Sequence, residues 1–460
     1  MDLTRIRSVD SLPIETLTQI FVLVCSMHLC PRSASYTSTQ PKLMSNPVIL
    51  SHVCSSWRHL AINSSSLWTH IDLIPGRLPA DQLPTSIETY LARAGEKLLD
   101  IHINSSRLDP VPSSGAQANL LRYLSTLAPR AWGVTVETTS RTHSAHSAHI
   151  LIVISTFFKK CVAGKLTHLS VKLSTGFHPF SGQAALTRQP QAMLEDLWLP
   201  VTVLRLRDFY PKWTSKAYHG LTELRMTGYH MSIPESSLIA VLQSSPKLRV
   251  LQISIRITTT PHQIPGSPIL LDDLEVFRPG EFDANSAMDH HTLVRLVQPG
   301  PKPLTLLIRN ISGRRIDSLG TESYEAIKSF LARSNVARLV LTGFVDYADL
   351  ADLLALSPTI RALALERLER VWVVEDESGL PLPSTLDVLY VMWSTHPSPK
   401  PFSSPMWPLI EQVIRRHSVP KLSLWCYSPT GGTIPDSLYN VCPHVAVIPD
   451  HYPNPIEEWK

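Results

Sequence analysis

The feature that most constrains the fold is a short apolar pattern that recurs along most of the chain. An aliphatic residue is followed three positions later by a second, and two positions after that by a third apolar residue. Residues two apart point to the same face of a β-strand, so each copy predicts a strand with one buried face. The middle residues of the ten full copies are Ile101, Leu169, Leu204, Leu224, Leu251, Leu274, Leu339, Leu363, Leu389 and Leu422. Two shorter copies, Val134-x-Val136 and Leu304-x-Leu306, lack the first residue.

The spacing of these copies predicts units of one strand and one helix. Successive copies lie 20 to 35 residues apart. Apolar residues with helical periodicity occupy Pro84–Ala94, Gln117–Leu127, His149–Lys160, Ser236–Gln243, Asn285–Val297, Glu322–Ala332, Tyr347–Leu356 and Pro408–Arg416. One such unit cannot bury its apolar face alone and must stack on its neighbours. Aliphatic pairs are common in any α/β protein, so other α/β layouts remain open.

This pattern resembles a leucine-rich-repeat solenoid, which implies an α/β fold with a parallel sheet and a partner-binding domain over residues 73–460. Regular members of that family often carry Asn or Cys three positions after the last aliphatic residue. This chain has other residue types there, such as Ser106, Phe209 and Arg309. The resemblance therefore implies an irregular solenoid.

The first seventy residues form short amphipathic segments. Pro13 suits the first turn of a helix, because its missing N–H has no partner there in any case. Leu17, Ile20, Phe21 and Val24 follow with helical spacing, and a second apolar segment begins near residue 46. A unit this small buries too little apolar surface to be stable alone, so we expect it to need a partner or a neighbouring domain. A helical cap on the following domain is the alternative.

These segments are similar to the F-box motif, which binds the Skp adaptor of cullin–RING ubiquitin ligases. The matching residues are Leu12, Pro13, Glu15, Leu17, Ile20, Phe21, Val53, Cys54, Trp57, Arg58, Leu60 and Ala61. The resemblance implies an adaptor-binding module over residues 8–72, with contacts made by Leu12, Pro13, Ile20, Phe21, Val53, Cys54 and Trp57. A long insert before residue 46 departs from the motif and is expected to be a surface loop.

Composition excludes several classes of protein. The chain of 460 residues is 43% hydrophobic and 17% charged, with a net charge of +4, which argues against disorder and against a nucleic-acid or membrane partner. No apolar run approaches the length of a membrane helix, and no signal peptide is expected. The six dispersed cysteines favour reduced thiols in a cytoplasmic or nuclear protein.

No motif for catalysis or for a cofactor emerges from the sequence. A phosphate-binding glycine loop, a nucleophile elbow and a zinc-protease helix are all missing, so we expect no enzyme, no cofactor and no metal. His143, His146 and His149 have helical metal-ligand spacing, but the serine-rich stretch around them predicts a solvated loop. A hydrolase or transferase hidden in the repeats remains a further alternative.

The expected function is that of an SCF-type substrate receptor, with the adaptor and cullin complex at the N-terminus and a protein substrate on the repeats. A scaffold without ligase function is the alternative. In a βα solenoid, residues between the aliphatic positions point away from the helices and line the concave face. They include the predicted partner-binding residues Arg205, Arg225, Gln252, Glu275 and Tyr390. We expect a mixed-charge segment near 205–275 and a drier segment near 340–425, or else a row of unrelated solvated residues.

Overall fold

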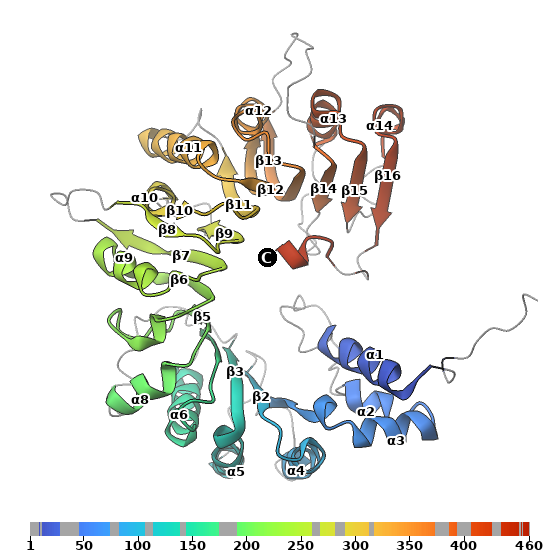
Figure 1. Cartoon of the computed structure of the whole chain (residues 1–460), viewed down its shortest axis with the longest axis vertical. Helices are drawn as coiled ribbons and strands as arrows, with labels where there is room; N and C mark the ends of the chain where they lie inside the picture. The colour runs from blue at the N-terminus through green and yellow to red at the C-terminus, as the bar shows by residue number, and fades with distance from the viewer. Residues whose placement is uncertain are drawn as a thin grey trace, which may run out of the picture. The chain divides into compact units, whose positions relative to one another are not determined.

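The structure, a computed structural model, describes residues 9, 12–27, 46–73, 82–105, 114–138, 144–173, 191–259, 267–280, 290–311, 317–372, 386–392, 406–425, 434–449, 452 and 454–459. The chain has an α/β fold with parallel strands, and it divides into two compact units, Met1–Pro211 and Lys212–Lys460. Sixteen described strands pair in parallel, five in the first unit and eleven in the second. Figure 1 shows the strands alternating with helices along the chain. The expected α/β class with a parallel sheet is confirmed.

In the first unit each strand pairs in parallel with the next strand along the chain. The strands are β1 (His70–Leu73), β2 (Leu99–Ser105), β3 (Ala131–Thr138), β4 (His168–Leu173) and β5 (Val203–Arg207). The helices between them are α4 (Gln82–Ala94), α5 (Ser114–Leu127), α6 (Ser144–Lys160) and α8 (Gln191–Trp198), with a 3-10 turn η3 (Ala128–Arg130). The repeated aliphatic residues stand side by side, because Val134 is aligned with Ile101 on one side and with Leu169 on the other.

The second unit continues the same alternation. Its strands are β6 (Glu223–Pro234), β7 (Val250–Thr258), β9 (Val276–Pro279), β11 (Leu304–Ile311), β12 (Val336–Asp346), β13 (Ala362–Trp372), β14 (Val388–Met392), β15 (Lys421–Trp425) and β16 (His444–Ile448). Two short strands, β8 (Ile269–Leu271) and β10 (Val297–Pro299), pair with each other in a separate sheet. The helical elements are η4 (Lys216–Tyr218), α9 (Glu235–Gln243), α10 (His290–Leu296), α11 (Asp317–Ala332), α12 (Tyr347–Leu356), α13 (Met406–His417), α14 (Asp436–Val441) and η6 (Glu457–Trp459).

The core lies between the strands and the helices. All ten middle residues of the apolar pattern are at most 1% exposed. The helices lie along one side of the strands (Figure 1). Nine of the ten also lie on paired parallel strands, as expected. Burying each such leucine or isoleucine contributes about 1.5–3 kcal/mol, so the pattern supplies much of the driving force for folding.

Leu274 is the exception, and the expected strand at this position is wrong. Leu274 is buried, but it lies in the turn between β8 and β9, where its N–H donates to the Leu271 carbonyl at 3.2 Å. Residues Ile269–Leu271 form β8 in the separate two-stranded sheet. The chain pairs with β7 only from Val276 onward, in β9. Phe277 therefore takes the place beside Leu251 that the pattern assigned to Leu274.

Three further elements differ from the sequence expectation. Strand β1 pairs with β2, so the expected domain boundary after residue 72 falls inside a strand of the sheet. Strand β16 adds a parallel partner for β15 that the repeat pattern did not include. Helix α6 begins at Ser144, five residues before the predicted start at His149, so His146 lies in a helix and not in the expected loop, while His143 lies outside the described residues.

The described N-terminal residues are helical, and together they are called the N-terminal module below. It contains α1 (Ile14–Met27), α2 (Asn46–Leu50), α3 (Ser55–Asn63) and the 3-10 helix η2 (Ser65–Trp68). Helix α1 begins directly after Pro13, and α2 begins at Asn46. Among the described residues, no helix combines the length and the apolar character that crossing a membrane requires.

Candidate functional site

The N-terminal module is held together by a small aromatic and aliphatic core. Leu17 and Phe21 on α1 are 6% and 1% exposed, and Leu60 on α3 is 8% exposed. The ring centroids of Phe21 and Trp57 lie 4.7 Å apart, which joins α1 to α3. Cys54 caps α3, since its sulfur accepts a hydrogen bond from the Trp57 N–H at 3.4 Å. These contacts fix the relative positions of the short helices.

Outside this core, the module exposes an unusual amount of apolar surface. Nineteen large hydrophobic residues are exposed in the described part of the chain, and nine of them lie between residues 9 and 62. The nine are Val9, Leu12, Ile14, Ile20, Val22, Leu23, Ile49, Val53 and Ile62. Single exposed apolar residues are normal on a protein surface, but such a concentration in one small module is unusual.

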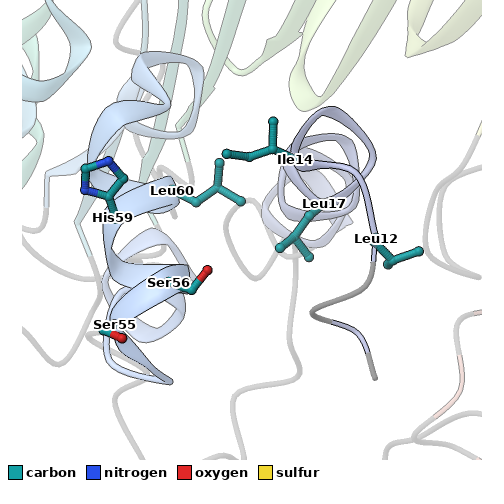
Figure 2. Close-up of a pocket in the computed structure, with 7 residues that line it drawn as sticks. All are labelled: Leu12, Ile14, Leu17, Ser55, Ser56, His59 and Leu60. Atoms are coloured by element: carbon teal, nitrogen blue, oxygen red, sulfur yellow. The ribbon is translucent and has the colours of Figure 1, made fainter. Parts of the chain in front are cut away.

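A hollow opens between the start of α1 and one face of α3. It has a volume of about 520 Å³. Figure 2 shows Ile14 and Leu17 on one side and Leu60 on the other, with Ser56 and His59 along α3. Leu12 and Ser55 complete the lining. The hollow has apolar walls with a polar edge, which is the chemistry that accepts an apolar side chain from a second protein.

The residues predicted to bind the adaptor separate into two groups in this module. The first group is exposed and consists of Leu12, Pro13, Ile20 and Val53. Val53, directly after α2, is 57% exposed. Phe21 is buried against Trp57, which is itself only partly exposed, so these two aromatic residues shape the surface from beneath. Cys54 is exposed at the cap of α3.

Trp68 connects the helical module to the first repeat. Its side chain is fully buried, and its ring N–H donates to the Ala61 carbonyl at 2.7 Å. On the side of α4, the Tyr90 ring meets the indole edge-on at 5.0 Å, and the Arg93 guanidinium lies over it at 4.2 Å. Burial also raises the pKa of Tyr90, so its hydroxyl stays protonated. The module and α4 therefore share one packed contact.

The predicted partner-binding row has charged residues at its beginning. Arg205 and Arg225 are partly exposed on β5 and β6, and Arg225 forms an ion pair with Glu223 at 2.5 Å. Gln252 on β7 is only 6% exposed. Glu275 lies ahead of β9 and accepts two hydrogen bonds from Arg249, at 2.8 and 3.1 Å.

Because of the shift at Leu274, Arg278 rather than Glu275 stands beside Gln252. Glu275 belongs instead to a charged cluster with Arg249 and Lys302, whose Nζ lies 3.5 Å from the Glu275 carboxylate. The hydrogen bonds from Arg249 lower the pKa of Glu275. The cluster is an ion-pair network on the rim of the strands and not part of the expected row.

The later, drier part of the row is covered by the end of the chain. Ile456 and Trp459 pack onto the strand face opposite the helices, and they are 0% and 8% exposed (Figure 1). Trp459 meets the Tyr390 ring edge-on, with centroids 5.1 Å apart at 88°, and Arg338 lies 5.3 Å over its indole. The residues beneath this C-terminal segment include Leu307, Val340, Ala362, Ala364 and Met392.

The sequence reasoning missed this C-terminal segment. Val340 and Ala364 are fully buried, and Ser423 is 2% exposed, so the segment near 340–425 is dry as expected but is covered within the chain. A signal was present in the pair Ile456 and Trp459, which are three residues apart after a proline and lie on the same side of a helical turn. Two apolar residues are too few to predict a contact with the strands from the sequence.

Comparison with known proteins gives no family for this chain. The sequence matches no protein-family model, and no curated protein matches it significantly.

Proposed function

We propose that this chain is a substrate receptor of an SCF-type cullin–RING ubiquitin ligase, in which the N-terminal helices dock a Skp-type adaptor. The observation that carries the proposal is the concentration of exposed apolar residues in the described part of residues 9–62. It agrees with the resemblance of these residues to the F-box motif. A surface of this kind lowers its free energy when a partner removes it from water, by about 25 cal/mol per Å² of apolar area buried.

The shape of the module supports a contact formed by several short elements. Leu12 and Ile14 stand at the edge of the hollow, while Val53 and Ile49 project from the segment around α2. The buried contact between Phe21 and Trp57 holds the two sides in fixed positions. A preformed surface loses little conformational entropy on binding, which favours a stable complex.

The stacked strands and helices supply the surface for the second partner. We read them as an irregular solenoid of the leucine-rich-repeat type, supported by the parallel pairing of neighbouring copies and by the burial of their shared aliphatic positions. In this function the chain performs no chemistry. It holds a protein substrate close to a ubiquitin-loaded enzyme that the ligase recruits.

The adaptor contact can be tested with matched charge substitutions in the full chain, co-expressed with a Skp-type adaptor. Leu12→Asp combined with Val53→Asp places carboxylates in the proposed contact, and we expect the dissociation constant to rise by ~30-fold or more, as for a binding hot spot. Leu199→Asp is the control, because Leu199 is 53% exposed against 57% for Val53 but lies at the end of α8. Equal thermal unfolding midpoints would show that all variants fold.

Undiminished co-purification of the adaptor with the Leu12→Asp, Val53→Asp variant would remove the basis of the proposal. The proteins that co-purify with the chain distinguish a ligase receptor from the alternative, a scaffold without ligase function. Both functions retain the adaptor, but only a ligase receptor should also retain the cullin.

A further inference from the structure

Two mirrored tripeptides lie side by side at the start of the sheet. Strand β1 begins with His70-Ile71-Asp72, and β2 contains Asp100-Ile101-His102. The parallel register aligns His70 with Asp100 and Asp72 with His102. Ile71 and Ile101 point into the core, so the four polar side chains all point to the opposite face. The pairing therefore gathers two imidazoles and two carboxylates on one small patch.

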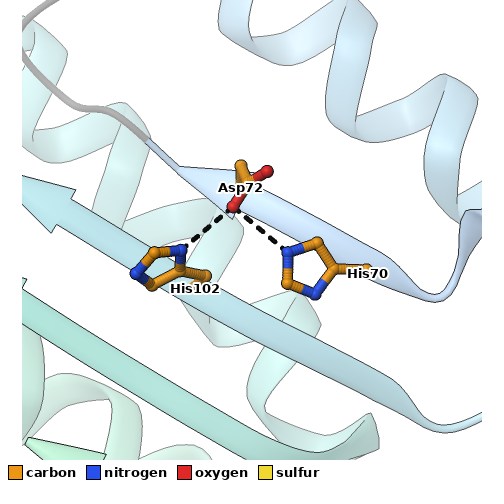
Figure 3. Close-up of side chains that lie close together, drawn as sticks. All are labelled: His70, Asp72 and His102. Atoms are coloured by element: carbon orange, nitrogen blue, oxygen red, sulfur yellow. Dashed lines mark hydrogen bonds and ion pairs between the residues drawn. The ribbon is translucent and has the colours of Figure 1, made fainter. Parts of the chain in front are cut away.

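Three of these side chains converge on a single point. One oxygen of Asp72 lies 3.2 Å from Nε2 of His70 and 3.1 Å from Nδ1 of His102. Figure 3 shows both rings turned toward the same carboxylate, one from its own strand and one from the neighbouring strand. One ligand atom from each of the three residues lies within 4.8 Å of the others. Two nitrogens and one oxygen therefore surround a common centre.

Each histidine also faces a second carboxylate through its other nitrogen. Nδ1 of His70 lies 2.9 Å from Asp100, and Nε2 of His102 lies 3.9 Å from Glu137 on β3. Histidines that bind a metal usually direct their other N–H to a carboxylate or a carbonyl, which fixes the ring and makes the ligating nitrogen more basic. His70 thus has the hydrogen-bonded outer carboxylate that is typical of a histidine metal site, whereas Glu137 lies at ion-pair distance from His102.

We propose that His70, Asp72 and His102 bind a zinc ion that ties β1 to β2. Zinc bonds of about 2.0–2.1 Å in tetrahedral geometry place neighbouring ligand atoms roughly 3.3 Å apart, close to the two distances at Asp72. Imidazole nitrogens favour zinc over magnesium or calcium, which take oxygen ligands. Three protein ligands leave a fourth position, and Asp72, with 40% of its side chain exposed, opens that position to solvent.

The local charge fits a divalent cation. Among the described residues, the carboxylates of Asp72, Asp100 and Glu137 lie at this patch, and Lys172 pairs with Glu137 at 2.6 Å. Carboxylates next to neutral imidazoles favour a bound divalent cation. Without the ion, the same contacts are cross-strand hydrogen bonds or ion pairs between the imidazoles and the carboxylates, which is the competing explanation.

Gly133 on β3 supports the position of Asp100. A Cβ at residue 133 would lie 2.8 Å from the Asp100 carboxylate oxygen, which is too close for an ordinary contact. Gly133→Ala should therefore displace the Asp100 carboxylate from His70. This substitution perturbs the outer carboxylate without touching any of the three proposed ligands.

The test is a zinc titration of the untagged full chain after treatment with a chelator and dialysis. We expect one Zn²⁺ per chain by calorimetry, and a higher thermal unfolding midpoint with Zn²⁺ but not with Mg²⁺ at the same concentration. Asp72→Asn and His102→Gln should abolish binding. Asp100→Asn and Gly133→Ala should weaken it about 10- to 100-fold, as for other outer groups of metal sites.

The double variant His146→Ala, His149→Ala is the matched control, because it removes two histidines of the other histidine-rich stretch and should leave the affinity for Zn²⁺ unchanged. If His102→Gln does not fold, Asp72→Asn still decides the question, since that side chain is partly exposed. A wild-type chain that binds no Zn²⁺ overturns the proposal and leaves the ion-pair explanation. Binding that survives Asp72→Asn, or that is lost only in the double variant, overturns it as well.

Discussion

Replacing Trp459 by Ala should release the C-terminal segment from the strands that it covers. Burial of a tryptophan removes roughly 150–250 Å² from water, which at about 25 cal/mol per Å² contributes about 4–6 kcal/mol. Burial of Ile456 adds about 1.5–3 kcal/mol. Ordering the six residues 454–459 costs about 1–2 kcal/mol each, about as much as this burial contributes, so the docked state of the segment is only marginally favoured. Losing the indole therefore makes docking unfavourable.

The variant should consequently lose the segment and not the fold. We expect the free energy of unfolding to fall by about 1–3 kcal/mol, less than the 3–5 kcal/mol typical of a core Trp→Ala change, because only the net docking energy is lost. The Trp459 N–H, which donates to the Ile456 carbonyl at 3.0 Å, belongs to the docked turn. Hydrogen exchange over residues 386–392 and 454–459 should accelerate, and the uncovered apolar face should bind a hydrophobic dye.

Tyr439→Ala provides the control, since Tyr439 is an aromatic residue of the same unit that is 54% exposed. It should leave exchange in both segments and the urea midpoint unchanged. If Trp459→Ala behaves like this control, the indole does not hold the segment and the reasoning is refuted. A fall of 5 kcal/mol or more would refute it differently, by showing that the segment is part of the cooperative core.

Three further predictions test the core and the thiols. Gly300→Ala should destabilise the second unit, because its Cβ would lie 2.6 Å from a backbone carbonyl, whereas Gly115→Ala has open space and should be neutral or slightly stabilising in urea unfolding. Leu251→Ala should cost about 2–5 kcal/mol as a core truncation measured by the same method. Burial raises the pKa of Cys25 from 9.0 to about 11, so alkylation at neutral pH should modify the exposed Cys54 first. The folded thiol of Cys25 has the higher pKa, so its contribution to stability is present below pH 9.0 and is lost as the pH rises through about 11.

Much of the repeat architecture was predictable because it rests on local periodicity. The spacing of aliphatic residues identified the buried strand positions, and Tyr347–Leu356 was predicted with its observed bounds as α12. The core pattern needs no knowledge of distant contacts, since each strand buries its alternate residues against its own helix. The helical module at residues 14–68 was visible for the same reason.

What escaped prediction depends on pairing between distant residues. The small sheet of β8 and β10 joins segments that carry too few residues for a periodic signal, and it displaces Leu274 from the large sheet. The C-terminal contact of Trp459 with Tyr390 requires the strands to exist first. The cluster around Asp72 depends on the register of β1 and β2, which aligns His70-Ile71-Asp72 with Asp100-Ile101-His102. The sequence alone does not give this register.

The buried Trp68 bears on which parts of a captured protein could be modified. Its indole packs against Tyr90 of α4 while its ring N–H donates to the Ala61 carbonyl, so the N-terminal helices and α4 are joined by a packed contact. A flexible tether would let a bound protein sweep through many orientations and average over its lysines. In the proposed receptor, this packed contact would restrict the orientations of a protein bound next to the N-terminal helices, and therefore the lysines that it presents for modification.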